Sequence, residues 1–154
     1  SYNSVSSQNA VISGMTDISG KISSDLRSGS WQKTADGSWR LIKSDGSKAK
    51  QEWAFLNGKW YLFDPNGKMV QGWACVDQIW YYLDAVNGDA KLGWQLINDE
   101  WYYFDNATAS MVTGWQMING KWYYLEPANG HMLTGKILVN GIEYLMASDG
   151  SLIE

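Results

Sequence analysis

The ten tryptophans of this chain fall into five pairs, and the spacing of the pairs repeats along the sequence. The members are eight residues apart in the first pair and seven apart in the other four. The pairs are Trp31 with Trp39, Trp53 with Trp60, Trp73 with Trp80, Trp94 with Trp101, and Trp115 with Trp122. An indole ring presents a flat, electron-rich face that attracts a cation. Ring pairs that recur in this way predict repeated sites for a cationic group.

A period of 20 to 22 residues that carries the same residue types indicates a stack of small repeated units. Each unit is expected to be a β-hairpin. In residues 114–134, Asn119-Gly120 is a strong turn signal, because a type I′ turn needs positive φ at both central positions. The flanks are aromatic and apolar, as strands prefer. Equivalent turns are expected at Asn57-Gly58, Asn98-Asp99 and Asn140-Gly141, with weaker turn chemistry at Asp77-Gln78.

Six units are expected, at residues 30–51, 52–71, 72–92, 93–113, 114–134 and 135–154. A lone two-stranded hairpin is marginal in water, and units of this size become stable by stacking on their neighbours. The predicted fold is therefore all-β, a solenoid of stacked β-hairpin repeats over residues 30–154.

Residues 1–29 differ from the repeats. They are rich in serine, yet their apolar residues Val11, Met15, Ile18, Ile22 and Leu26 follow a helix-like spacing of three or four. Serine and glycine are poor helix formers. This part is predicted to be a linker or N-terminal extension, or a weak helix that lies against the first repeat.

The turn of each hairpin fixes which side chains share a face. With Asn119-Gly120 at the tip, Trp115 is expected to lie opposite Tyr124, and residues directly opposite each other share a face. Because side chains alternate along a strand, Trp115 and Trp122 lie on one face and Tyr123 on the other.

The first unit contains one extra residue between its tryptophans. Ala35-Asp36-Gly37 is predicted to form a three-residue loop with glycine at the left-handed position. That loop pairs Lys33 with Trp39 and Trp31 with Leu41. The two tryptophans then share a face, as in the other units.

The two ends of the repeat array indicate how the hairpins meet. The first unit has Arg40 in place of the tyrosine, and the last has Tyr144 but Lys136 and Glu143 in place of the tryptophans. Each tryptophan pair therefore matches the tyrosine of the next unit. The expected sets are Trp31, Trp39 and Tyr61; Trp53, Trp60 and Tyr81; Trp73, Trp80 and Tyr102; Trp94, Trp101 and Tyr123; and Trp115, Trp122 and Tyr144.

Three aromatic faces around a small gap would form a cage for a quaternary ammonium group, which donates no hydrogen bonds and is held by ring faces and apolar contact. Met69, Met111 and Met132 share one position after these hairpins and would close a wall of the cage. Ala90 in the third unit would make that wall thinner. The alternative is that the rings and methionines simply fill the core of a thin solenoid.

Composition excludes several other functions. The net charge of −4 argues against nucleic acid and mildly favours a cationic ligand. Cys75 is the single cysteine, so no internal disulfide is expected. No residues show metal-ligand spacing or a nucleophile–base pairing, so we expect no metal, no cofactor and no enzymatic activity. No apolar run is long enough for membrane insertion. Because the sequence starts at Ser1 without Met, we expect a piece of a larger protein.

The repeats resemble the choline-binding repeats of bacterial cell-wall proteins. The resemblance covers about residues 30–154 and is carried by Gly114–Leu125 (GWQMINGKWYYL), Gly93–Phe104 (GWQLINDEWYYF) and Asn57–Met69 (NGKWYLFDPNGKM). It implies a left-handed β-solenoid that binds choline of teichoic or lipoteichoic acid between two tryptophans of one repeat and a tyrosine of the next.

The resemblance also implies a secreted protein bound non-covalently to the bacterial surface, and a homodimer formed through the terminal hairpin. Related aromatic repeats in glucan-binding domains and clostridial toxins bind carbohydrate, so the alternative function is recognition of a glucan or host glycan. A third reading is a structural spacer whose interfaces are filled and inert.

Overall fold

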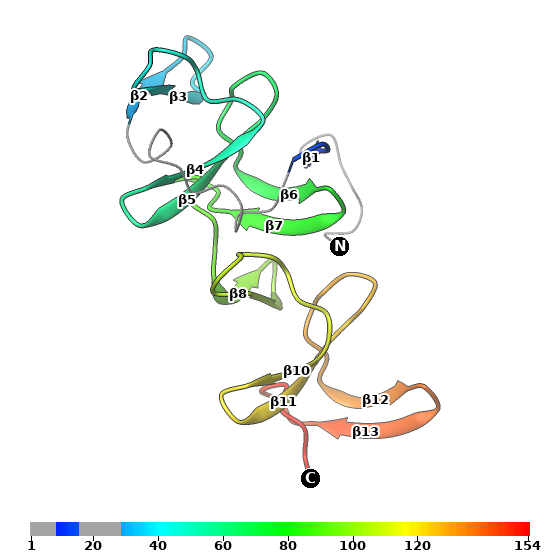
Figure 1. Ribbon diagram of the computed structural model, residues 1–154. Coiled ribbons are helices and arrows are strands. Elements are labelled where there is room, and N and C mark those ends of the chain that lie inside the picture. The colour runs from blue at the N-terminus through cyan, green and yellow to red at the C-terminus, as the bar shows by residue number, and fades with distance from the viewer. Residues whose placement is uncertain (1–8, 16–28) are drawn as a thin grey trace. The chain divides into compact units, whose positions relative to one another are not determined.

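The computed structural model describes residues 9–15 and 29–154, which are built from β-strands and turns (Figure 1). These residues form two compact units. The first unit contains residues 9–15, 29–91 and 106–110, and the second contains residues 92–105 and 111–154. No helix in the described residues is long and apolar enough to cross a membrane.

In residues 9–15 and 29–154, each unit contains three antiparallel hairpins, which gives six hairpins in tandem. In the first unit they are β2 (Gly29–Lys33) with β3 (Trp39–Lys43), β4 (Glu52–Leu56) with β5 (Lys59–Phe63), and β6 (Gly72–Val76) with β7 (Ile79–Leu83). In the second unit they are β8 (Gly93–Ile97) with β9 (Glu100–Phe104), β10 (Gly114–Ile118) with β11 (Lys121–Leu125), and β12 (Gly135–Val139) with β13 (Ile142–Met146). The predicted all-β class of tandem hairpins is confirmed.

The hairpin tips have the predicted turn geometry. Both central residues have positive φ in the five two-residue turns, as a type I′ turn requires. Neither Asp77 nor Gln78 is a glycine, yet their φ values are 48° and 71°. In the first hairpin, Gly37 lies in the left-handed region with φ of 87°, which confirms the three-residue loop.

The strand register confirms the predicted distribution of side chains between the two faces. Trp115 lies opposite Tyr124, and Gln116 lies opposite Tyr123. In the first hairpin, Lys33 lies opposite Trp39 and Trp31 opposite Leu41, despite the longer loop. In each of the five hairpins that carry a tryptophan pair, the two tryptophans therefore share a face.

A backbone hydrogen bond recurs between neighbouring hairpins. At four connecting turns, the residue that follows the turn donates its N–H to the carbonyl of the second tryptophan in the preceding hairpin. Met69 donates to Trp39 at 2.8 Å and Ala90 donates to Trp60 at 2.8 Å in the first unit. In the second unit Met132 donates to Trp101 at 2.7 Å and Leu152 donates to Trp122 at 2.8 Å. The second tryptophan thus fixes the turn that comes after the next hairpin.

The hydrophobic core lies between successive hairpins. In the first unit one buried cluster centres on Leu41, Phe63 and Met69, and another centres on Trp53 and Tyr81. In the second unit Phe104, Leu125 and Met146, which end the second strands of their hairpins, are buried. Because a two-stranded hairpin has no interior of its own, these contacts between hairpins supply its stability.

The N-terminal segment adds a strand to the third hairpin. β1 (Ala10–Ile12) runs parallel to β6, with Ala10 opposite Ala74 and Ile12 opposite Val76. Ile12 is buried, whereas Val11 is exposed. The predicted helix-like segment against the first repeat is therefore wrong at these residues, because their alternation follows a strand. Ile18, Ile22 and Leu26 lie outside the described residues.

The turn with the weakest sequence signal holds this segment in place. The two carboxylate oxygens of Asp77 accept hydrogen bonds from the backbone N–H groups of Gly14 at 2.7 Å and Met15 at 2.8 Å. The N–H of Asp77 donates to the carbonyl of Ile12 at 2.9 Å. The Gln51 side chain donates to the Ser13 carbonyl at 2.9 Å. Asp77 therefore both forms a hairpin turn and anchors the N-terminal segment.

We expect the Asp77→Asn variant to loosen the N-terminal segment and leave the third hairpin folded. Asparagine occupies this position in four sister turns, but its side chain has one acceptor oxygen instead of two, so one hydrogen bond of about 1 kcal/mol is lost. Amide hydrogen exchange measured by NMR should accelerate at Gly14 and Met15 and stay unchanged in β6 and β7. Equal acceleration in β6 and β7 would show that Asp77 acts only through the turn.

Candidate functional site

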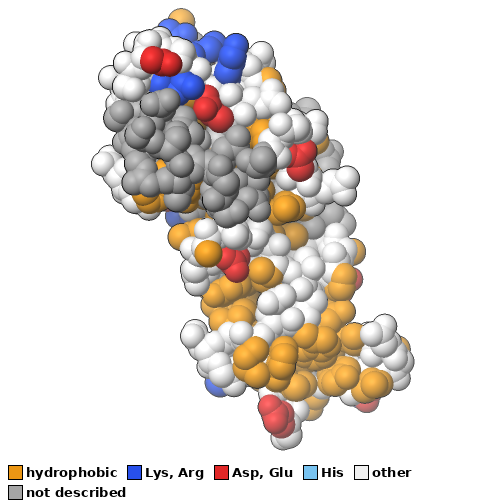
Figure 2. Space-filling view, viewed as in Figure 1, with side chains coloured by type: hydrophobic (Ala, Val, Ile, Leu, Met, Phe, Trp, Pro, Cys, Tyr) orange, Lys and Arg blue, Asp and Glu red, His pale blue; other side chains and the backbone are white. Residues whose placement is uncertain are grey.

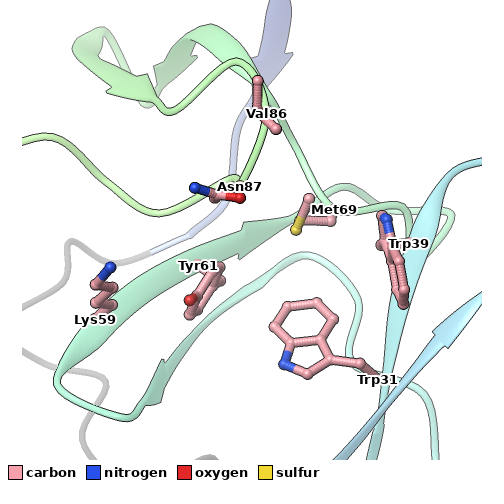
Figure 3. A pocket seen from close by; sticks show the side chains of 7 residues that line it. All are labelled: Trp31, Trp39, Lys59, Tyr61, Met69, Val86 and Asn87. Atoms are coloured by element: carbon pink, nitrogen blue, oxygen red, sulfur yellow. The ribbon is translucent and has the colours of Figure 1, made fainter.

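The first predicted set of rings lines an open pocket in the first unit (Figure 3). The ring centroids of Trp31 and Tyr61 are 5.0 Å apart, with the rings at 71° to each other. Trp39, which is partly exposed, and Met69, which is buried, line the same pocket. Its volume is about 390 Å³, and Lys59, Val86 and Asn87 complete the lining. Two tryptophans, the tyrosine of the next hairpin and a methionine thus surround one space.

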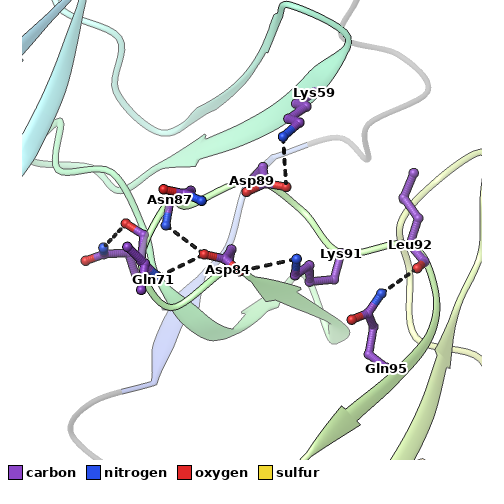
Figure 4. A network of polar contacts seen from close by, with 9 residues as sticks. Lys59, Gln71, Asp84, Asn87, Asp89, Lys91, Leu92 and Gln95 are labelled. Atoms are coloured by element: carbon purple, nitrogen blue, oxygen red, sulfur yellow. Dashed lines mark hydrogen bonds and ion pairs between the residues drawn. The ribbon is translucent and has the colours of Figure 1, made fainter.

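The turn after the third hairpin supplies part of that lining and is held by a polar network (Figure 4). The Asp84 carboxylate accepts hydrogen bonds from the backbone N–H groups of Asn87 at 2.7 Å and Val86 at 3.0 Å, and it pairs with Lys91 at 3.2 Å. Gln71 donates to the Val86 carbonyl at 3.0 Å. The hydrogen bonds to Asp84, of which that from Asn87 has the largest effect, and the charge of Lys91 hold the pKa of Asp84 below its usual value. Val86 and Asn87 are therefore fixed at the edge of the pocket.

The fourth set forms a similar pocket in the second unit. Trp94 lies 5.0 Å from Tyr123 and 6.4 Å from Trp101 between ring centroids, and both contacts are edge-to-face. The pocket has a volume of about 310 Å³. It is lined by these three rings together with Met132, Ser148 and Asp149. Trp101 is 41% exposed, so one ring of the set faces solvent.

The fifth set has the same ring geometry. Trp115 lies 4.9 Å from Tyr144 and 6.4 Å from Trp122, at interplanar angles of 70° and 90°. Trp122 is 38% exposed. The N–H of Leu152 is bonded to the Trp122 carbonyl at 2.8 Å, so the Leu152 backbone takes the position that Met69 and Met132 take at the first and fourth sets.

In the second set, Trp53 and Tyr81 are in contact, but both rings are buried and closed off from solvent. Trp53 and Tyr81 are 4.9 Å apart, and their exposed fractions are 0% and 1%. Ile12 belongs to the same buried cluster, and Met15 and Trp60 pack against it. A ligand at this set would have to displace packed atoms, including those of the N-terminal segment.

The third set is divided between the two units. Trp73 and Trp80 belong to the first unit, where their ring centroids are 6.1 Å apart. Tyr102 belongs to the second unit, where it is buried. Because the three rings belong to different units, a site shared by Trp73, Trp80 and Tyr102 stays a prediction.

The methionine position is matched to a glycine in the next connecting turn. A Cβ atom added to Gly88 would lie 2.5 Å from the sulfur of Met69, and the same conflict arises between Gly150 and Met132 and between Gly130 and Met111. The fourth connecting turn has Ala109 at this position, with φ of 64°. Ala90 stands where the methionine would be, and it packs against the cluster that contains Ala109. The smaller Ala90 thus makes room for the extra Cβ atom.

Sequence reasoning missed the turn residues at the pocket edges, namely Val86 and Asn87 in the first pocket and Ser148 and Asp149 in the fourth. It also missed Lys59. The repeat period contains the signal that could have found the turn residues, because both turns have the same place in it. The tryptophans come from one hairpin, the tyrosine from the next, and the turn residues follow the hairpin after that.

Two titratable groups that line the open pockets, Tyr61 and Asp149, have shifted pKa values. Burial, together with Asp89, raises the pKa of the Tyr61 phenol, so this ring stays neutral. Hydrogen bonds from Ser151 hold the pKa of Asp149 below its usual range. His131 lies 3.8 Å from Glu100. Across residues 9–15 and 29–154, no group of three His, Cys, Asp or Glu residues could hold a metal ion.

Comparisons with known proteins identify the family of these repeats. The choline-binding repeat family matches residues 51–92, 91–136 and 112–153. The chain belongs to this family. Among solved structures, it is similar to choline binding protein F from Streptococcus pneumoniae, with 40% identity over 82% of this chain and a TM-score of 0.77. It is also similar to CbpJ from the same organism, with 38% identity, 82% coverage and a TM-score of 0.77.

A third similar structure is the cell wall endolysin from phage Cp-1 complexed with choline, with 31% identity over 87% of this chain and a TM-score of 0.57. The match spans 42% of choline binding protein F, 42% of CbpJ and 40% of the endolysin. No curated protein sequence matches the chain.

The pairing of Ala90 with Ala109 predicts a coupled response to mutation. Ala90→Met alone should lower the free energy of unfolding by about 1–3 kcal/mol, because the longer side chain meets the Cβ atom of Ala109. Adding Ala109→Gly should recover most of that loss, as in the turns that combine methionine with glycine. Urea denaturation of both single variants and the double variant would measure the coupling. Additive effects would show that the two positions do not share space.

Proposed function

We propose that this chain is a non-catalytic binding module that holds the choline groups of teichoic or lipoteichoic acid in the gaps between hairpins. It would thereby anchor a protein to the bacterial cell surface. The observation that carries the proposal is the repeated set of two tryptophans and the next hairpin's tyrosine, which in two cases lines an open pocket with a methionine.

The chemistry of these pockets suits a quaternary ammonium group. Its methyl groups need apolar contact, and its charge is attracted by the ring faces rather than by hydrogen-bond acceptors. Each well-placed ring contributes about 0.5–2 kcal/mol, so one pocket is expected to bind choline with a Kd on the order of millimolar. Several weak pockets on one chain would gain avidity on a polymer that carries many choline groups.

The sets are not expected to contribute equally. The open first and fourth pockets and the partly exposed fifth set are the proposed ligand sites, with Met69 and Met132 as walls. The buried second set, Trp53, Trp60 and Tyr81, is proposed to act mainly as core. The relatives support a choline ligand, since the phage endolysin was solved as a complex with choline.

Titration with choline chloride, followed by tryptophan fluorescence, tests the proposal. We expect a saturable change at millimolar choline, with sodium chloride as the ionic-strength control. Trp31→Ala and Trp94→Ala should each remove part of the amplitude, because each deletes a ring of an open pocket. Trp53→Ala should mainly lower stability. A chain that does not respond to choline but binds a glucan would overturn the proposal in favour of carbohydrate recognition.

The terminal hairpin supports a proposed homodimer. Its Leu138 and Leu145 stand on the face that carries tryptophans in other hairpins, and they are 72% and 50% exposed. Figure 2 shows hydrophobic side chains gathered on the second unit. We expect the chain to sediment as a dimer and Leu138→Asp to sediment as a monomer, because a charge would be buried at the interface. Leu92→Asp, at another exposed leucine, is the control. A wild-type monomer at high concentration would contradict this.

A further inference from the structure

The two open pockets have the same rings but opposite charges at their edges. Lys59 lines the first pocket, and the ammonium of Lys33 lies 5.9 Å from the ring centroid of Trp39. In the fourth pocket the charged lining residue is Asp149. Asn87 in the first pocket and Asp149 in the fourth both precede the glycine of their turns, so the repeat itself makes them equivalent.

Further positive charge adjoins the first pocket. A second hollow of about 500 Å³ shares Trp39 with it and is lined by Arg40, Lys48 and Lys68. Asp36 and Asp64 also line this hollow, and Lys59 pairs with Asp89 at 4.0 Å. Within the described residues, Arg40, Lys48 and Lys68 form no ion pair. Figure 2 shows Lys and Arg side chains gathered in the region of β2 and β3.

The carboxylate in the fourth pocket is held in a fixed position. Asp149 Oδ1 accepts hydrogen bonds from the Ser151 N–H at 2.9 Å and the Ser151 hydroxyl at 2.6 Å. The Asp149 side chain is exposed, and Lys121 is close enough to favour its charged form. The fourth pocket therefore keeps a negative charge at its edge, which is partly offset by one lysine.

We infer that the two open pockets select different ligands by charge. The fourth pocket takes a bare quaternary ammonium cation, whose charge Asp149 attracts. The first pocket takes a quaternary ammonium that carries an anionic group on a neighbouring atom, so that the anion faces Lys59 and the basic hollow beside Trp39. This inference rests on the proposed function, because both pockets must first bind the ammonium group.

The test compares three probes at each pocket of the full chain. Choline is a cation, phosphocholine adds an anionic phosphate, and 3,3-dimethylbutan-1-ol is the neutral analogue of choline with the same shape. The indole N–H signals of ¹⁵N-labelled Trp31 and Trp94, assigned from Trp31→Phe and Trp94→Phe, report the first and fourth pockets separately. A full charge near the pocket edge should change a ligand's Kd by about threefold at a water-exposed site.

We expect phosphocholine to bind the first pocket more tightly relative to choline than it binds the fourth. Asp149→Asn should raise the Kd for choline at Trp94 about threefold and leave the Kd for the neutral analogue unchanged. The difference in affinity between choline and phosphocholine at this pocket should become smaller. Asn87→Asp should strengthen choline at Trp31 by a similar factor. Asp45→Asn is the matched control, because Asp45 is held by Ser47 through the same two hydrogen bonds but does not line either pocket.

The outcomes separate this inference from the proposed function. If choline shifts both indole signals but the ratio of phosphocholine to choline affinity is the same at both pockets, charge selection is wrong while choline binding stands. If Asp149→Asn weakens choline and the neutral analogue equally, its effect is on shape, and charge selection is again wrong. If no probe shifts either signal, the proposed function fails and the inference fails with it.

Discussion

The structure depends on the contact between an aromatic ring of one hairpin and the next hairpin. A two-stranded hairpin has nothing to bury against itself, so Trp31, Trp53, Trp94 and Trp115 each meet a tyrosine from the following hairpin at 4.9 to 5.0 Å. The backbone of the second tryptophan then bonds the turn beyond that hairpin. The rings that would bind a ligand are therefore the same rings that hold the hairpins together.

Much of this could be predicted because the information is local. Asn119-Gly120 and its equivalents fix the turn, the turn fixes the register, and the register assigns each ring to a face. The match of a tryptophan pair to the next tyrosine, which is seen for four of the five pairs, followed from Arg40 and Tyr144 at the two ends. None of these steps needed knowledge of how distant parts of the chain meet.

The rest depended on contacts between residues far apart in sequence. β1 pairs in parallel with β6 across more than 60 residues, and no local period encodes such a pair. Asp77 has weak turn chemistry by sequence alone. Its second role, which is to accept hydrogen bonds from Gly14 and Met15, can be recognised only once the N-terminal segment is placed beside it. The pocket edges at Asn87 and Asp149 were missed for the same reason, since a turn two hairpins along the sequence provides them.

The relation between Ala90 and Ala109 has a consequence for how such arrays change over time. Each hairpin repeat provides one side of a steric match, and the following repeat provides the other side. The methionines Met69, Met111 and Met132 therefore occur where the next connecting turn has glycine. A repeat that was copied or deleted by recombination would keep its own turn but would meet a different neighbour. Repeats that combine glycine with methionine are thus interchangeable one at a time, whereas the repeats that carry Ala90 and Ala109 should be gained or lost together.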